Sequence, residues 1–189
     1  LRRNQQVEAV REIGDEVAHE IDTTALMDLL ASRVMALLDA EGSALYVWED
    51  EEQMLVARAA QGLLRESLLD RRRLGEGFVG AVGEQRRGLV ANDFPCSPSV
   101  LSSRSESAGA QAAMAEPLLF RARLLGVVQV VRGQHGSPFD EEDSYALCLF
   151  AKQAALALEH SRLWAELNES LGRLQVLQED ALRVEKLQT

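Results

Sequence analysis

The spacing of hydrophobic residues divides the chain into a helical start, a mixed middle and a helical end. Apolar residues recur every three or four positions over 2–19, which predicts a narrow amphipathic helix. A second helix, with a wide apolar face, is expected to begin at Asp22-Thr23-Thr24, because such residues favour helix starts, and to end before Gly42.

The middle of the chain contains short apolar runs that are separated by polar or glycine-containing turns. Strands are predicted at 43–48, 54–60, 88–91, 115–120 and 124–131. Residues 74–82 predict a glycine-rich turn and a short helix, whereas the small and polar residues of 95–113 predict a mobile loop. The fold class is therefore expected to be α+β, with a mostly antiparallel sheet of about five to six strands.

From Asp140 the helical pattern continues to the end of the chain without a proline and with one glycine, Gly172. Its first half is apolar enough to lie on the sheet. In the second half, apolar residues follow alternating steps of four and three, which is the repeat of a coiled coil. The predicted seam contains Leu163, Leu167, Leu174, Leu177, Ala181 and Val184. One helix cannot bury this seam on its own domain, so a homodimer is expected.

Charge and composition exclude several partners. The formal net charge of −10 argues against nucleic-acid binding and against contact with an anionic membrane, because both need clustered Lys and Arg. The one basic run, Arg71-Arg72-Arg73, is expected to be a solvated loop. With no apolar run of about 18 residues, no recognisable signal peptide and only two cysteines, a cytoplasmic location is expected.

Several segments, in this order, resemble the GAF domain, a small-molecule sensor module of signalling proteins. They are Ser43–Trp48 as the first strand, Leu74–Val82 as the glycine turn, Leu89–Asp93 as a strand ending in Asn-Asp, and Gly126–Val131 as the fifth strand. The resemblance implies a central antiparallel sheet, helices on one face, and a ligand pocket on the other face under residues 92–113. The expected parts are an N-terminal signalling helix (1–20), a GAF sensor domain (21–162) and a C-terminal coiled-coil signalling helix (163–189).

The resemblance also suggests ligand-binding residues. Alternation along 43–48 puts Tyr46 and Trp48 on the same face of the sheet, and the family resemblance makes this the pocket side. It further implies that Asn92 and Phe94 stand at the pocket mouth and that Met114 enters from the far end of the loop. The ligand is not identified by the sequence. The alternative is that these residues pack a closed core and that the domain is a ligand-free dimerisation spacer.

The last residues resemble a second family. Ala181–Gln188 is similar to the run into the dimerisation and phosphoacceptor helix of sensor histidine kinases. This implies a non-catalytic sensor domain that regulates an output kinase domain in a longer chain, as part of a two-component system. Because cyclases, phosphodiesterases and transcription activators carry similar helices, the nature of the output domain stays open.

Two motifs suggest nucleotide chemistry, and each has a simpler explanation. Residues 75–80 fit G-x-G-x-x-G, but no buried strand precedes them, so glycines with positive φ in a turn are expected instead of a dinucleotide site. His19 lies in a segment that resembles a kinase phosphoacceptor box. It lacks an ATP-binding partner domain in this chain, so a solvent-facing histidine is expected.

The cysteines and histidines do not form a recognisable reactive or metal-binding set. Cys96 lacks the Cys-His pair of chromophore-binding relatives, so no covalent chromophore is expected, although a redox role stays open. A GAF-fold methionine sulfoxide reductase would need a second thiol near Cys96, whereas Cys148 is expected in the core of the last helix. His19, His135 and His160 are scattered, so no metal is expected, and a haem held by one of them is a further alternative.

Overall fold

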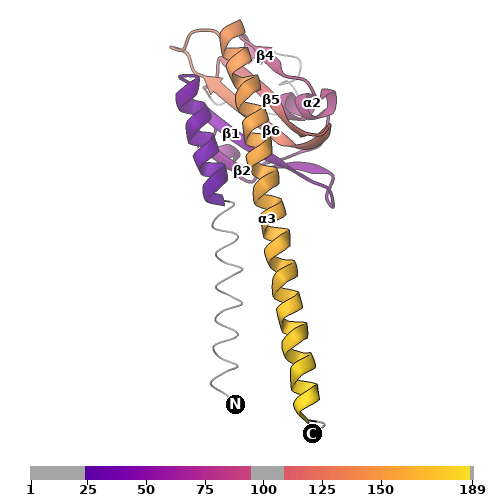
Figure 1. Ribbon diagram of the computed structural model, residues 1–189. Helices are drawn as coiled ribbons and strands as arrows, with labels where there is room; N and C mark the ends of the chain where they lie inside the picture. Colours follow the sequence, from indigo (N-terminus) through magenta and orange to yellow (C-terminus); the bar gives the residue numbers. More distant parts are fainter. Residues whose placement is uncertain (1–23, 95–108, 188–189) are drawn as a thin grey trace.

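A six-stranded antiparallel sheet forms the centre of the part of the molecule that the structure describes (Figure 1). The structure is a computed structural model that describes residues 24–94 and 109–187. The strand order is β3-β2-β1-β6-β5-β4, and every neighbouring pair is antiparallel. The bounds are β1 Gly42–Glu49, β2 Met54–Gly62, β3 Arg71–Arg72, β4 Leu89–Ala91, β5 Ala112–Phe120 and β6 Arg123–Arg132. The predicted α+β fold with an antiparallel sheet is confirmed.

Two helices cover one face of this sheet. They are the helix over 24–37 and the upper half of α3 (Glu141–Leu187), whose lower half projects beyond the sheet (Figure 1). Their apolar residues pack with Leu45, Val128 and Val130 of the sheet in what we call the helix-side cluster. Asp140 and Asp143 cap α3 reciprocally, since each backbone N–H donates to the other carboxylate at 3.2 and 2.9 Å.

The opposite face of the sheet carries the short helix α2 (Gly77–Gln85), which packs on β5 and β6. We call the buried residues here, which include Tyr46, Phe78 and Val127, the α2-side cluster. The predicted turn glycines precede and begin this helix, with φ of +80° at Gly75 and +67° at Gly77. No parallel strand precedes α2 in the described part of the sheet, which agrees with a backbone turn and not with a dinucleotide site.

Arg132 joins three separate elements of the domain. Its guanidinium contacts the Asp143 carboxylate at 2.9 Å, donates to the Leu38 carbonyl, and lies 4.2 Å from the Phe139 ring centroid. The side chain is 8% exposed, so these contacts satisfy a buried charge. Arg132 therefore holds the end of β6, the end of the helix over 24–37 and the start of α3 together.

Three expectations about the fold were wrong. The run Arg71-Arg72 is not a solvated loop, because it pairs with β2 and the buried Arg72 contacts the Asp70 carboxylate at 2.9 Å. Strand β5 begins at Ala112 and not at residue 115, because Gln111 and Ala112 already pair with the end of β6. Cys148 is only partly buried on α3 and is not a core residue.

Candidate functional site

The α2-side face of the sheet is the part of the domain where the sequence predicted a ligand site. Alternation along β1 is as predicted: Ala44, Tyr46 and Trp48 belong to the α2-side cluster, whereas Leu45 and Val47 belong to the helix-side cluster. Successive strand residues point to opposite faces, so β1 separates a helix-covered core from this second core.

Phe94 lies inside this second core and not at its mouth. Its side chain is fully buried, and its ring meets the ring of Phe78 from α2 edge to face, with centroids 5.3 Å apart and planes at 84°. The backbone N–H of Phe94 donates to the carbonyl of Gln111 at 2.9 Å, which fixes the end of β4 beside the start of β5. Phe94 therefore packs the second core together with α2.

Asn92 has a structural role that the sequence did not reveal. Its amide nitrogen donates to the Phe139 carbonyl at 2.9 Å, and its amide oxygen accepts from the Phe139 N–H at 2.8 Å. Both hydrogen bonds fasten the end of β4 to the segment before α3. Because the backbone of Phe139 occupies both polar atoms, the prediction that Asn92 stands at a pocket mouth is not supported.

Met114 does not lie on the face where the sequence placed it. It is near the start of β5, opposite Val130 of β6, and it packs in the helix-side cluster. Its strand neighbours Ala113 and Ala115 face α2 instead. The earlier start of β5 fixes this alternation, so Met114 does not contribute to the α2-side face.

Gln129, which the sequence patterns did not single out, is an unusual polar residue on this face. Its side chain is 0% exposed, and neither Nε2 nor Oε1 has a hydrogen-bond partner within the part of the chain that the structure describes. In the sheet it lies between Ala44 of β1 and Ala115 of β5. The signal was present in the sequence, since Gln129 is the one polar residue within the apolar run 124–131.

The strands contribute little side-chain volume around Gln129. Alanine occupies six strand positions of the α2-side cluster, namely Ala44, Ala57, Ala60, Ala91, Ala113 and Ala115. The strand alanines of the helix-side cluster are Ala59 and Ala112. Small side chains leave the backbone surface of the sheet close to whatever covers it, and binding sites commonly combine such apolar walls with a few polar groups.

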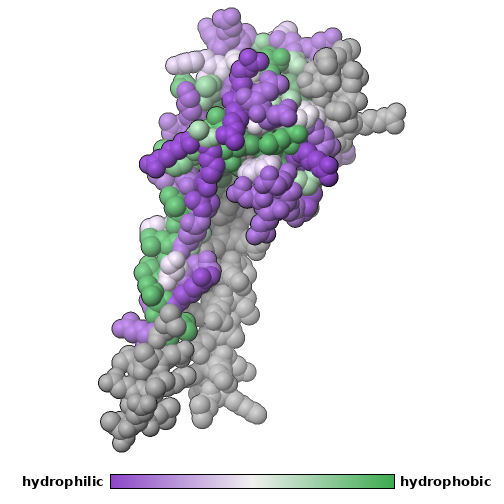
Figure 2. Space-filling view, turned by 90° about the vertical axis from the view of Figure 1, so that its right-hand side faces the viewer, coloured by the Kyte–Doolittle hydropathy of each residue, from purple (hydrophilic) through white to green (hydrophobic). Residues whose placement is uncertain are grey.

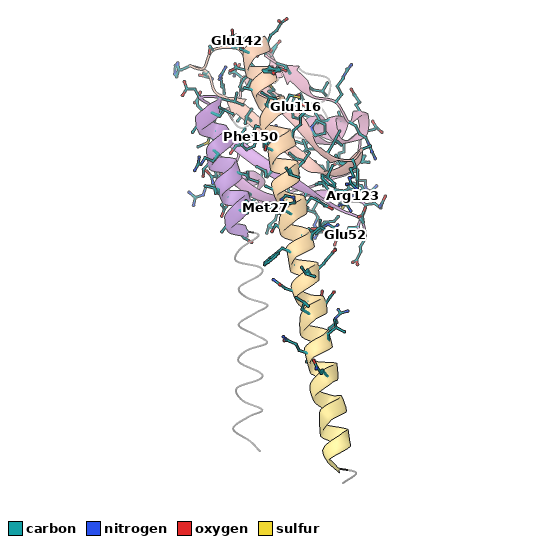
Figure 3. The ribbon with its side chains drawn as sticks, in the orientation of Figure 1. Met27, Glu52, Glu116, Arg123, Glu142 and Phe150 are labelled. Carbon is teal, nitrogen blue, oxygen red and sulfur yellow. The ribbon has the colours of Figure 1, made fainter. Side chains whose placement is uncertain are left out.

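Charged residues with shifted pKa values lie on the other side of the sheet. Burial raises the pKa of Glu116 above its ordinary 4.5, and the positive charge of Lys152 acts in the opposite direction. A hydrogen bond from Arg162 is the largest influence that lowers the pKa of Glu159 below 4.5, and Arg123 also contributes. Figure 3 labels Glu116 near the middle of the sheet and Arg123 at its lower edge.

Glu159 fixes the point where α3 leaves the sheet. Its side chain is 6% exposed and contacts Arg123 of β6 at 2.6 Å and Arg162 of α3 at 2.9 Å. Arg123 follows the turn between β5 and β6, where the carbonyl of Ala122 accepts a hydrogen bond from Arg86 at the end of α2. A short series of contacts thus connects α2, the β5–β6 turn and α3.

Other reactive groups show no such organisation within the described residues. No three His, Cys, Asp or Glu side chains of residues 24–94 and 109–187 gather in a way that could hold a metal ion. The predicted roles of His19 and Cys96 lie outside the described residues, while His135 and His160 are exposed. In the same part of the chain, no helix combines the length and the apolar character that crossing a membrane would require.

Comparisons with known proteins support one family. The family model of the GAF domain matches residues 20–159. A search of curated proteins finds no match. Many solved structures share the fold. The first of three examples is the GAF domain of a phosphoenolpyruvate-protein phosphotransferase from Coxiella burnetii (23% identity, TM-score 0.68, covering 85% of this chain and 96% of that one).

The second structure is the second GAF domain of DevS from Mycobacterium smegmatis, with 20% identity, a TM-score of 0.64, and coverage of 77% of this chain and 99% of that one. The third is a free methionine-R-sulfoxide reductase from Neisseria meningitidis in complex with its substrate, with 24% identity, a TM-score of 0.64, and coverage of 79% and 86%. At these identities the likeness shows a common fold and does not transfer an activity.

Proposed function

The chain belongs to the GAF domain family, and on that premise we propose that it is a non-catalytic sensory domain of a signalling protein. It binds a small molecule on the α2-side face of its sheet and transmits binding through α3. The observation that carries this proposal is that β5 and β6 contact α2 on one face and α3 on the other. Any ligand that displaces these strands therefore acts directly on the helix that leaves the domain.

The contacts at the lower edge of the sheet support this transmission. Arg86 connects α2 to the β5–β6 turn, and Arg123 connects the end of the same turn to Glu159 of α3. Glu159 is buried and forms ion pairs with two arginines. A shift of the β5–β6 turn therefore changes the ion pair between Arg123 and Glu159, at the point where α3 leaves the sheet. A ligand shifts such an equilibrium only by its difference in affinity for the two arrangements.

The projecting helix is proposed to pair with a second copy of the chain. A stripe of apolar side chains on α3 is between 40% and 68% exposed and consists of Tyr145, Leu149, Leu156, Leu163, Leu167, Leu171 and Leu174. Hydrophobic side chains follow the projecting helix in Figure 2. The stripe begins above the predicted seam, so the dimer contact extends along the domain as well. Leu177, Ala181 and Val184 lie on α3 with only their backbone described.

The proposed output domain is a histidine kinase of a cytoplasmic two-component system. The support is the resemblance of Ala181–Gln188 to the run into a kinase phosphoacceptor helix. A cysteine-dependent reductase is the weaker candidate, because Cys148 lies on α3, which covers the opposite face of the sheet from α2. A ligand-free spacer is the other alternative, and the following experiment separates it from a sensor.

The test is a thermal-shift screen of a metabolite panel with two matched variants. Ala115→Val adds two methyl groups on the α2 side of β5, whereas Ala112→Val adds them on the helix side of the same strand. If the domain is a sensor, at least one compound should raise the Tm of the parent and of Ala112→Val, and should raise the Tm of Ala115→Val by less. If no compound stabilises the parent, the spacer alternative is correct. If both variants respond like the parent, the ligand binds elsewhere.

A further inference from the structure

The carboxamide of Gln129 is a buried polar group with unused hydrogen-bonding capacity. Its donor and acceptor are both shielded from solvent, and neither is paired within the described residues. Buried polar groups in folded proteins almost always have partners, because an unpaired one is unfavourable. A glutamine kept at such a position therefore indicates that something other than this chain's described groups completes its hydrogen bonds.

The neighbours of Gln129 define which groups can pair with it. The flanking residues on both adjacent strands, Ala44 and Ala115, provide neither charge nor hydrogen-bonding side chains. A carboxamide presents an N–H donor beside a carbonyl acceptor in one plane. The complementary group therefore has an acceptor beside a donor, also in one plane.

We infer that Gln129 recognises a neutral, planar amide-like group of the ligand, a carboxamide or a lactam whose N–H lies beside its carbonyl. This inference rests on the small-molecule site proposed above. Two parallel hydrogen bonds form between the ligand amide and the Gln129 amide, and the alanine side chains contact the flat faces of the ligand. Since the amide has no contact with solvent, the ligand displaces the groups that cover it.

A charged ligand group fits this position less well. A carboxylate would accept from Nε2 but would leave Oε1 unpaired and close to a second negative oxygen. An ammonium would pair with Oε1 and leave Nε2 without an acceptor. Because Ala44 and Ala115 supply no counter-charge, either ion would also lose its hydration without compensation.

The experiment uses two probes that differ in one donor. 2-Pyridone carries an N–H beside its carbonyl, whereas N-methyl-2-pyridone has the same ring and carbonyl without the donor. Two-dimensional ¹H–¹⁵N NMR of the labelled full chain follows the side-chain NH₂ signals of Gln129, which are identified by their absence in Gln129→Met. Gln85→Met, an exposed glutamine at the end of α2, is the matched control.

We expect 2-pyridone to shift the Gln129 signals saturably and N-methyl-2-pyridone to bind about tenfold more weakly or worse. Gln129→Met should weaken 2-pyridone binding by a similar factor, and Gln85→Met should not. The probe comparison in the parent protein needs no variant, so it stands even where Gln129→Met fails to fold. Equal binding of the two probes, or no shift of the Gln129 signals up to the solubility limit, overturns the inference.

Failure of this inference is distinguishable from failure of the proposed function. Suppose that a compound of the metabolite panel binds the parent and Gln129→Met equally well but binds Ala115→Val more weakly. The ligand site on the α2-side face then exists, and Gln129 does not bind an amide group of the ligand. If neither the panel nor the probes bind, both proposals are wrong. Only a donor-dependent and Gln129-dependent response supports both.

Discussion

Replacing Gln129 by methionine should stabilise the ligand-free protein, which is unusual for a change in the middle of a buried strand. Methionine has nearly the shape of glutamine but no groups that require hydrogen bonds. Leaving a buried polar group unpaired is unfavourable by about 1–3 kcal/mol. Both polar atoms of Gln129 are fully buried and unpaired among the described residues, so the variant relieves this penalty.

The size of the expected effect follows from two opposing terms. Volume-conserving changes in a core usually lose less than about 1.5 kcal/mol through imperfect packing. Subtracting such a loss from the relieved penalty gives a net change between about −0.5 and +3 kcal/mol, centred on a gain of about 1 kcal/mol. For a chain of this size, each 1 kcal/mol raises Tm by about 2–4 °C.

Urea denaturation at equal protein concentration measures this gain, with parent and variants first unfolded, dialysed and refolded to remove any bound ligand. Leu118→Met is the matched control, because Leu118 is equally buried on the helix side of β5 and has no penalty to relieve. It should be neutral or destabilising by up to about 1.5 kcal/mol. If Gln129→Met lowers the unfolding free energy by about 1 kcal/mol or more at an unchanged m-value, the Gln129 amide is paired in the ligand-free protein.

Three further predictions concern the dimer, the core and pH. Glutamate at both Leu167 and Leu174 should produce monomers in light scattering, because the change places charges opposite the partner helix. Arg132→Met should lower the unfolding free energy by about 3–5 kcal/mol, because it leaves the Asp143 carboxylate without its arginine partner, whereas Arg58→Met at an exposed pair should change it by less than about 1 kcal/mol. Because the pKa of Glu159 is lowered in the folded protein, ionised Glu159 contributes to the free energy of unfolding above pH 4.5. This contribution is lost as the pH falls through the folded-state pKa of Glu159, and Glu159→Gln should remove it.

Each of these predictions has an outcome that contradicts it. If the double glutamate variant stays dimeric, the dimer interface does not lie on the projecting helix. Arg173→Glu, which replaces an exposed positive charge, is the control for the added negative charge. If Arg132→Met and Arg58→Met change the free energy of unfolding equally in urea denaturation, the contacts of Arg132 do not hold the three elements together. Acid denaturation curves that coincide for the parent and Glu159→Gln would show that Glu159 does not hold a lowered pKa.

Much of the fold could be predicted because local pattern and topology agree. The alternation of β1 follows from period-two spacing in a strand with one core on each side, and the glycines at 75 and 77 follow from a turn that needs positive φ. Arg71-Arg72 could not be predicted as a strand, because two residues carry no periodicity. They pair with Leu55 and Val56 of β2, beyond the intervening turn and 3-10 helix, so no local pattern indicates the pairing.

The candidate site was harder to predict than the fold. The sequence places Asn92 at a pocket mouth, whereas its side chain hydrogen-bonds the backbone of Phe139. Because Phe139 is 47 positions further along the chain, no local pattern predicts this hydrogen bond. Met114 was misplaced because an error in the start of β5 removed the alternation that fixes its face. For Gln129, the sequence shows a polar residue within an apolar run. It does not show that the side chain has no hydrogen-bond partner among the described residues.

The most direct test of the central claim is native mass spectrometry of the protein as purified from cells, with the parent and Gln129→Met compared. We expect a parent dimer, at twice the 20.8 kDa chain mass, that carries an additional non-covalent small molecule. The same molecule should be missing or strongly reduced in the Gln129→Met dimer. A parent dimer without any bound molecule, or an identical bound molecule in both proteins, would contradict the claim that this face of the sheet is a sensory site read by Gln129.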